Sequence, residues 1–398
     1  MCVARKAKGI ALAANKELLE EPIESQEMTT DQRAQAKQYG RRELFCALAD
    51  KFLDAAFLAV AAFLLARPVD AWLQHSSLLE GNWTLRLVAL FLVITGLHIL
   101  VSFPLSYYSG HVLEHQFQMS TQSFGRWLWR YVKRIGLGTF FSLLLVVGLY
   151  WVIWTVGGWW WLTAAALFFV VSIVLGQLTP VLILPLFYKI EKLDTPELTE
   201  RIARLAKGTG LSIEGVYRMN LSEETVKANA MLAGLGHTRR VLLGDTLLDG
   251  FSPDEIEVVF AHEIGHHVFR HIRKLILAGL AFSAAGFFVC DRLLVAWAGQ
   301  GGVPFSYSQL PVSTLPFLLL VLTLFTMVME PLQNAVSRRF ERQCDRYAIE
   351  KTGLRAAYIS AFQKLAKLNK DDPNPHWLDV LLFHSHPPVA ERLAMAEK

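Results

Sequence analysis

The stretch "VVFAHEIGHHVFRHI", from Val258 to Ile272, places four histidines and one glutamate beside long apolar segments. His262 and His266 are four residues apart, so on a helix their imidazoles share one face. Glu263 follows the first of them and completes the H-E-x-x-H pattern, in which the two histidines bind one Zn²⁺ and the glutamate is a general base. The stretch indicates either a reactive metal centre or a histidine-rich helix beside a membrane.

The residues that precede the motif predict that it lies on a helix. Ser252 can cap the helix, Pro253 suits its first position, and Glu255 completes a capping box.

The composition indicates a membrane protein. Of 398 residues, 53% are hydrophobic and 19% are charged, whereas about a quarter of the residues are charged in an ordinary soluble domain. A net charge of +4 gives little support for a nucleic-acid partner, and the four cysteines form no CxxC pair. A reduced compartment without a disulfide framework fits them.

The apolar residues gather in blocks long enough to cross a bilayer, which takes roughly 20 residues in a helix. We predict six spans, at Phe52–Ala66, Leu87–Phe103, Ile135–Val156, Trp159–Phe187, Leu275–Trp297 and Leu315–Met329. The polar tail and the connection between spans two and three are basic, whereas the connections on the opposite side carry almost no positive charge. The spans are expected to lie in the lipid bilayer, and both termini and the active site are therefore expected on its cytoplasmic side.

Five segments follow from these spans: a basic and polar tail (1–45), spans one to four (46–188), a cytoplasmic insert (189–272), spans five and six (273–333), and C-terminal helices (334–398). In the insert, Thr195 and Pro196 predict a helix start. The stretches "IEGVYRM", "ANAMLAGLG" and "RRVLLGDTLL" predict short strands.

A hydrolytic zinc site needs a third protein ligand. Glu341 and Asp345 are four residues apart on the predicted helical continuation of the last span. Glu341 can supply the third ligand, and Asp345 can accept a hydrogen bond from a ligand histidine. The alternative is that both belong to a solvated helix face. His267 and His271 are expected beside the site or at an interface.

Five pieces of the sequence occur in the order seen in one family: "LPLFYKIEKLDTPEL", "KANAMLAGLGHTRRVLLGDTLL", "FAHEIGHHVFRH", "NAVSRRFERQCDRYA" and "HSHPPVAERL". In these pieces the chain resembles the integral-membrane zinc metallopeptidases of the type I CaaX prenyl protease family. The resemblance implies a mainly α, polytopic helical membrane protein of six to seven spans. These helices would surround an intramembrane chamber, and the cytoplasmic zinc-peptidase domain would contain a small β-sheet.

The resemblance also implies the roles of six residues. His262, His266 and Glu341 would bind one Zn²⁺ and Glu263 would be the general base. Asn229 would contact the substrate backbone at a strand edge, and His386 would stabilise the oxyanion; a turn asparagine and a surface histidine are the alternatives.

The predicted function is a membrane-embedded zinc metalloendopeptidase that cuts extended peptide or protein substrates. Processing of lipidated CaaX tails and quality control of membrane proteins are both compatible with the residues. The alternatives are a non-catalytic scaffold or transporter with structural zinc, which normally has four protein ligands and no adjacent base, and a haem-binding membrane protein.

Overall fold

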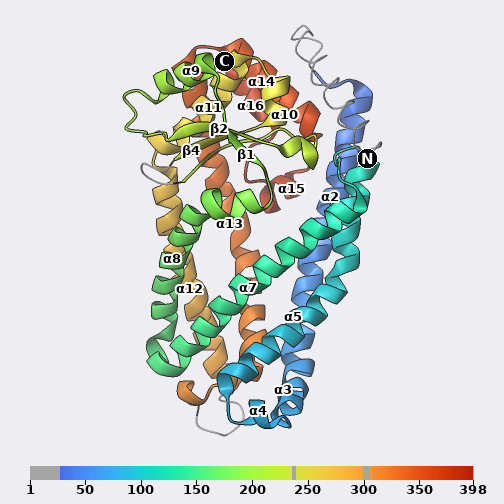
Figure 1. The fold of residues 1–398 in the computed structure, drawn as a ribbon, viewed down its shortest axis with the longest axis vertical. Helices are drawn as coiled ribbons and strands as arrows, with labels where there is room; N and C mark the ends of the chain where they lie inside the picture. Colours follow the sequence, from blue (N-terminus) through green and yellow to red (C-terminus); the bar gives the residue numbers. More distant parts are fainter. Residues whose placement is uncertain (1–26, 235–238, 299–304, 398) are drawn as a thin grey trace.

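The computed structural model describes residues 27–234, 239–298 and 305–397. Figure 1 shows long helices that extend away from a smaller domain, which contains the sheet. The long helices are α2 (Thr30–Val60), α5 (Trp83–Tyr107), α7 (Phe124–Val156), α8 (Trp160–Leu178), α12 (His271–Ala298) and α13 (Leu315–Thr352), and the shorter α3 (Ala66–Gln74) extends the first apolar stretch after α2. The helix α13 runs from the long-helix bundle into the smaller domain (Figure 1).

Five helical stretches among the described residues are long and apolar enough to cross a membrane. One of them, Phe124–Leu186, contains two helices, α7 and α8. The chain turns between them at Gly157, whose φ is 66°. Five of the six predicted spans therefore fall within one of these apolar helical stretches, and the remaining one, Trp159–Phe187, extends one residue beyond Leu186. The count of six arises where one stretch contains two helices.

The predicted tail differs from the structure in part. Residues 1–26 lie outside the described residues, but α2 already begins at Thr30 and continues into the first apolar stretch. Thr29 and Gln32 form a capping box: the Thr29 Oγ1 accepts the Gln32 N–H at 3.2 Å, and the Gln32 Oε1 accepts the Thr29 N–H at 3.0 Å. The last part of the polar segment 1–45 is therefore the beginning of a long helix.

A four-stranded sheet forms the base of the smaller domain, in the order β1-β2-β4-β3. The strands are β1 (Ile190–Lys192), β2 (Gly215–Met219), β3 (Ala230–Ala233) and β4 (Arg240–Gly244). β2 and β4 are parallel, whereas β1 and β3 are antiparallel to their neighbours and form the two edges. The predicted strand at an exposed edge is thus β3.

Two details of the insert differ from the sequence prediction. The end of the third predicted strand is the short helix α10 (Asp245–Gly250), and the strand β1 was not predicted. The helix predicted after Thr195 is α9 (Pro196–Ala206), although the Thr195 side chain makes no capping hydrogen bond.

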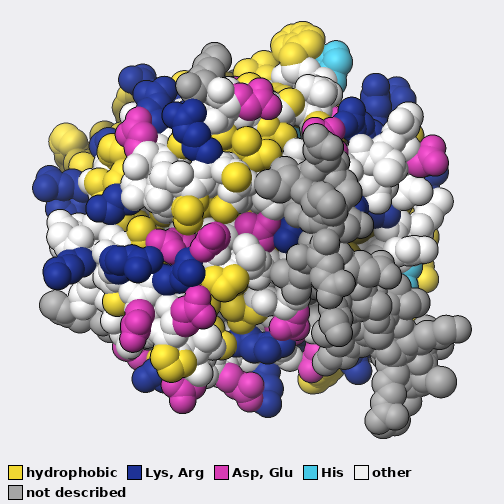
Figure 2. Space-filling model, turned by 90° about the horizontal axis from the view of Figure 1, so that it is seen from above, with side chains coloured by type: hydrophobic (Ala, Val, Ile, Leu, Met, Phe, Trp, Pro, Cys, Tyr) yellow, Lys and Arg dark blue, Asp and Glu magenta, His cyan; other side chains and the backbone are white. Residues whose placement is uncertain are grey.

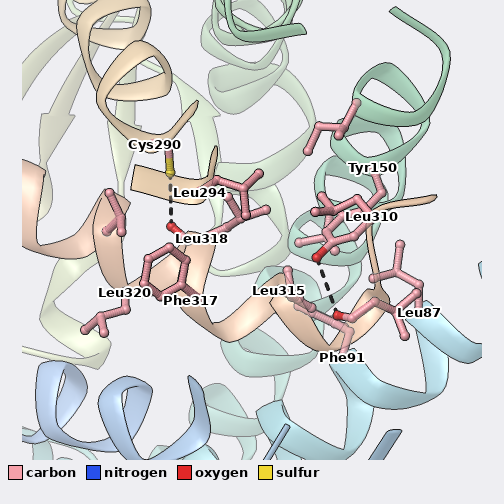
Figure 3. Packing of buried hydrophobic residues seen from close by; sticks show 14 of the residues in the cluster. Leu87, Phe91, Tyr150, Cys290, Leu294, Leu310, Leu315, Phe317, Leu318 and Leu320 are labelled. Carbon is pink, nitrogen blue, oxygen red and sulfur yellow. Dashed lines mark hydrogen bonds between the residues drawn. The ribbon is translucent and has the colours of Figure 1, made fainter. Parts of the chain in front are cut away.

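The bundle of long helices and the smaller domain each have a hydrophobic core. One core joins the long helices and includes Leu87, Tyr150 and Leu318. Figure 3 shows part of this core, in which the Cys290 Sγ lies 3.5 Å from the Leu318 carbonyl oxygen. The other core lies between the sheet, α9, α11 (Pro253–Val268), α13, α14 (Arg355–Asn369) and α16 (Val389–Ala396). It fixes the helix that carries H-E-x-x-H.

Candidate metal and catalytic site

The helix α11 begins as predicted. The Ser252 Oγ accepts the Glu255 N–H at 3.4 Å, and a Glu255 carboxylate oxygen accepts the Ser252 N–H at 2.7 Å. The buried Glu255 side chain also pairs with Lys364 of α14 at 2.9 Å and accepts the Ser360 hydroxyl. The same carboxylate that caps α11 therefore ties the helix to its neighbour, which leaves the motif on a rigid support.

The packing of α11 against α13 brings the three predicted ligands together. The His262 Nε2 lies 3.1 Å from one Glu341 carboxylate oxygen, and the His266 Nε2 lies 3.3 Å from the other. One ligand atom from each of the three residues lies within 4.8 Å of the other two. His262 and Glu341 are buried, and His266 is half-buried.

These residues fit a metal ion. The Glu341 Oε2 is buried, and among the described residues it accepts no hydrogen bond of normal geometry. An unsatisfied buried carboxylate oxygen beside two imidazoles carries a desolvation cost that a cation removes. Two nitrogen donors and one carboxylate are a common ligand set for a catalytic zinc ion.

A second layer of side chains holds His262. Its Nδ1 lies 2.9 Å from the Asp345 Oδ1, and the buried Arg392 of α16 donates from its Nε to the Asp345 Oδ2 at 3.0 Å. Burial lowers the pKa of His262, but the interactions with the Asp345 and Glu341 carboxylates outweigh it and raise this pKa to about 9. A carboxylate behind a ligand histidine fixes the orientation of its ring. Arg392 was not predicted.

His266 has a different second layer. Its Nδ1 lies 3.3 Å from the His271 Nδ1, and the His271 Nε2 lies 3.0 Å from the Gln343 Oε1. The His271 ring stacks on Phe340, with ring centroids 4.1 Å apart. His271 thus lies beside the site, as expected, whereas His267 points to Arg239 at 2.8 Å.

Glu263 lies in a cavity of about 540 Å³ together with His262, Asn229 and His386. Burial raises the pKa of the Glu263 carboxyl above its ordinary value, while His262 and His266 act in the opposite direction. The backbone of Leu232 in β3 hydrogen-bonds to this carboxyl group. A carboxyl group with a raised pKa in a cavity beside a candidate metal site is suited to accept and release a proton.

The remaining predicted residues line the same cavity. The His386 Nε2 lies 3.4 Å from the Glu341 Oε2. Asn229 directly precedes the edge strand β3, its side chain is exposed, and its carbonyl oxygen accepts the Gly244 N–H at 2.9 Å. All seven side chains singled out from the sequence thus lie at or next to one site.

The two halves of the chain match two family models. Residues 192–398 match the model of peptidase family M48, and residues 11–189 match the model of the CAAX prenyl protease N-terminal region with five membrane helices. The chain belongs to peptidase family M48. The resemblance noted in the sequence is thereby confirmed, and the M48 chain is a multi-pass membrane metalloprotease.

Known proteins resemble this M48 chain over most of its length. An uncharacterized metalloprotease of Bacillus subtilis, YhfN, is 30% identical over 84% of this chain and 82% of its own length. CAAX prenyl protease 1 of Saccharomyces cerevisiae is 30% identical over 76% of this chain and 70% of its own. The crystal structure of S. mikatae Ste24p has the same fold, with a TM-score of 0.83 at 22% identity, over 100% of this chain and 98% of that one. The predicted fold class, a mainly helical membrane protein with a small sheet, is confirmed.

Proposed function

We propose that this M48 protease holds one zinc ion on His262, His266 and Glu341. The observation that carries the proposal is the convergence of these three side chains from α11 and α13, with ligand atoms within 4.8 Å of one another. A zinc ion held by these residues would acidify a water molecule and polarise the peptide carbonyl group. The proposed ligand His262 lines the same cavity as Glu263 and His386.

The chain's own groups supply the proton transfers. Glu263 takes a proton from the attacking water and passes it to the leaving nitrogen, a task that its raised pKa favours. His386 donates a hydrogen bond to the negative charge that develops on the carbonyl oxygen. The Ser385 hydroxyl lies 3.0 Å from the His386 Nδ1 and orients the ring.

The edge strand β3 supports docking of an extended substrate by strand addition. In the antiparallel pair with β4, the backbone of Asn229 bonds inward to Gly244. Because the direction of backbone groups alternates along a strand, Ala230 and Leu232 direct their N–H and C=O groups outward. The outward Leu232 backbone already reaches Glu263, so a peptide paired with this edge passes directly over the general base.

We propose that the substrate is the C-terminal part of a peptide or protein, including a lipidated one. The support is that several relatives bear the name CAAX prenyl protease 1, among them proteins of Saccharomyces cerevisiae and Arabidopsis thaliana. The basic residues in the first turns of α7, which are Arg126, Arg130, Lys133 and Arg134, support a cytoplasmic position for the active site and both termini.

The test combines metal analysis with cleavage of a generic peptide and of a farnesylated CaaX peptide. We expect about one zinc per chain and cleavage that a chelator abolishes and added zinc restores. The Glu263→Gln variant should lose 10²–10⁴-fold in rate while it keeps the metal and the fold. A scaffold with structural zinc would be indifferent to this substitution, and a Soret band in the purified protein would indicate haem instead.

A further inference from the structure

A basic surface surrounds the turn between α11 and α12. It consists of Arg239, which precedes β4, Arg270 in the turn, and Arg273 and Lys274 at the start of α12. We call these four residues the elbow cluster. Among the described residues, none of the four has a carboxylate within 4.0 Å, whereas the next residue, Arg240, pairs with Glu214 at 2.8 Å.

The elbow cluster comes from three parts of the fold, yet its members act on one another. The Arg239 Nη1 lies 2.8 Å from the His267 Nδ1. The Arg239 Nε is buried and has no hydrogen-bond partner among the described residues. Burial, and then the charge of Arg273, lower the pKa of the Arg239 guanidinium. The repulsion between these cations and the unsatisfied buried donor both favour binding of an anion at this surface.

The backbone conformation at Arg270 also supports binding of an anion. Its φ is 56°, in the left-handed region, and its N–H donates to the His267 carbonyl at 3.0 Å, where α11 ends. Glycine is the usual residue at this position after a helix, because a side chain there is disfavoured. In this chain the position is occupied by an exposed arginine, which adds a positive charge in place of the usual glycine.

The elbow cluster lies where α12 turns apolar. Leu275 and Leu277, which are 48% and 64% exposed, follow Arg273 and Lys274 directly. Arg273 and Leu277 are four residues apart and share one helix face. Lys274 lies over the Phe340 ring, 5.5 Å from its centroid. Cations one turn before lipid-facing leucines lie at the level of the lipid headgroups.

We propose that the elbow cluster binds the phosphate of an anionic phospholipid headgroup in the leaflet next to the catalytic domain. Figure 2 shows this end of the molecule from above, with Lys and Arg side chains interspersed among Asp and Glu side chains on its surface. The neighbouring exposed leucines favour a lipid, whose acyl chains they can contact, over free phosphate. The bound headgroup would brace the turn that follows the H-E-x-x-H helix.

The experiment compares the full-length protein with the Arg270→Gln/Arg273→Gln/Lys274→Gln variant, purified in a neutral detergent. Native mass spectrometry during titration with phosphatidylglycerol, phosphatidylcholine or inorganic phosphate counts bound ligands. Thermal unfolding in nanodiscs of phosphatidylcholine, with or without 30% phosphatidylglycerol, measures the stabilisation. The control, Arg204→Gln, removes a cation of the same domain that already pairs with Glu257 at 3.2 Å.

We expect the wild type and the control to bind phosphatidylglycerol at least tenfold more tightly than phosphatidylcholine. The triple variant should lose most of this preference and the associated rise in melting temperature. The variant should still cleave a soluble peptide at the wild-type rate in neutral detergent, which shows that it is folded. If it does not fold, the single variants Arg270→Gln and Lys274→Gln are compared in the same way, each with a severalfold loss expected. Equal binding of both lipids by the wild type, unchanged binding by the variants, or equal protection by inorganic phosphate would overturn the proposal.

Discussion

Gly265 of α11 lies directly against Cys344 of α13: a Cβ atom on the glycine would come within 3.1 Å of the cysteine Cα, Cβ and Sγ atoms. This close contact lies between the two segments that carry the proposed ligands. A methyl group at residue 265 would push α13 away, because backbone as well as side-chain atoms are in its path.

The substitution Gly265→Ala is therefore expected to destabilise the protein by about 1–3 kcal/mol, the usual cost of overpacking a core. It should also weaken metal binding, because Glu341 moves with α13. Thermal unfolding and competition with a zinc chelator measure the two effects. Gly279→Ala in α12 is the control, since nothing lies within 4 Å of the position of its Cβ atom. Equal behaviour of the two variants would contradict the assigned role of the contact.

Asp345→Asn tests the layer behind His262. The amide cannot match the negative charge that orients the His262 ring and pairs with Arg392, so we expect metal affinity to fall 10–100-fold. A competition assay with a fluorescent zinc chelator measures this affinity. Asp249→Asn is a matched control, because its partner Arg218 lies at 3.1 Å on a more exposed surface. A loss of affinity no larger than in the control would argue against a positioning role for Asp345.

The raised pKa of His262 predicts that a higher pH lowers the stability of the metal-free protein but raises its affinity for zinc. Its value of about 9 in the folded chain exceeds the ordinary value of 6.5. Protonated His262 therefore stabilises the metal-free fold fully below pH 6.5, and this contribution disappears as the pH rises through 9. Metal binding requires the neutral ring, so zinc affinity should rise over the same interval.

Thermal unfolding of metal-free protein between pH 6 and pH 10, beside zinc titrations at each pH, checks both parts of this prediction. Metal-free His262→Gln protein is the control, and its unfolding curve should lack this component. A metal-free wild type that becomes more stable relative to this control as the pH rises would contradict the assignment.

Lys227→Met tests whether the entry to the edge strand matters for substrate binding. Lys227 lies two residues before Asn229. Its Nζ lies 2.7 Å from the Tyr39 hydroxyl of α2 and 3.6 Å from a Glu114 carboxylate oxygen. Because this network is partly exposed, we expect KM to rise only a fewfold with kcat nearly unchanged. Steady-state cleavage kinetics measure the split, with Lys207→Met, at the end of α9, as the control. A fall in kcat at constant KM would place Lys227 in another role.

The sequence predicts the parts of the site that have a local pattern. Four-residue spacing placed His262 with His266 and Glu341 with Asp345, and apolar patterning located the spans. Arg392 could not be predicted in this way, since it meets Asp345 only through tertiary packing of α16 against α13. The same is true of the stacked His271 and Phe340 rings.

Errors in the fold prediction have physical causes as well. The strand β1 has three residues, too few for an alternating pattern to appear. The residues after β4 are apolar enough for a strand, yet Asp245 begins a helix there and accepts the Ser222 N–H at 2.8 Å. The polar first turns of α2 are helical because they pack against the loop that follows α6 (Glu114–Gln116), a contact that no local pattern reveals.

The position of β3 at the edge of the sheet has a consequence for how cuts would be distributed along one substrate. A peptide that pairs with this edge presents alternate side chains to opposite sides. A slip of one residue turns every side chain over, whereas a slip of two restores the same arrangement. On the proposed docking, secondary cleavage products would therefore differ in length by even numbers of residues.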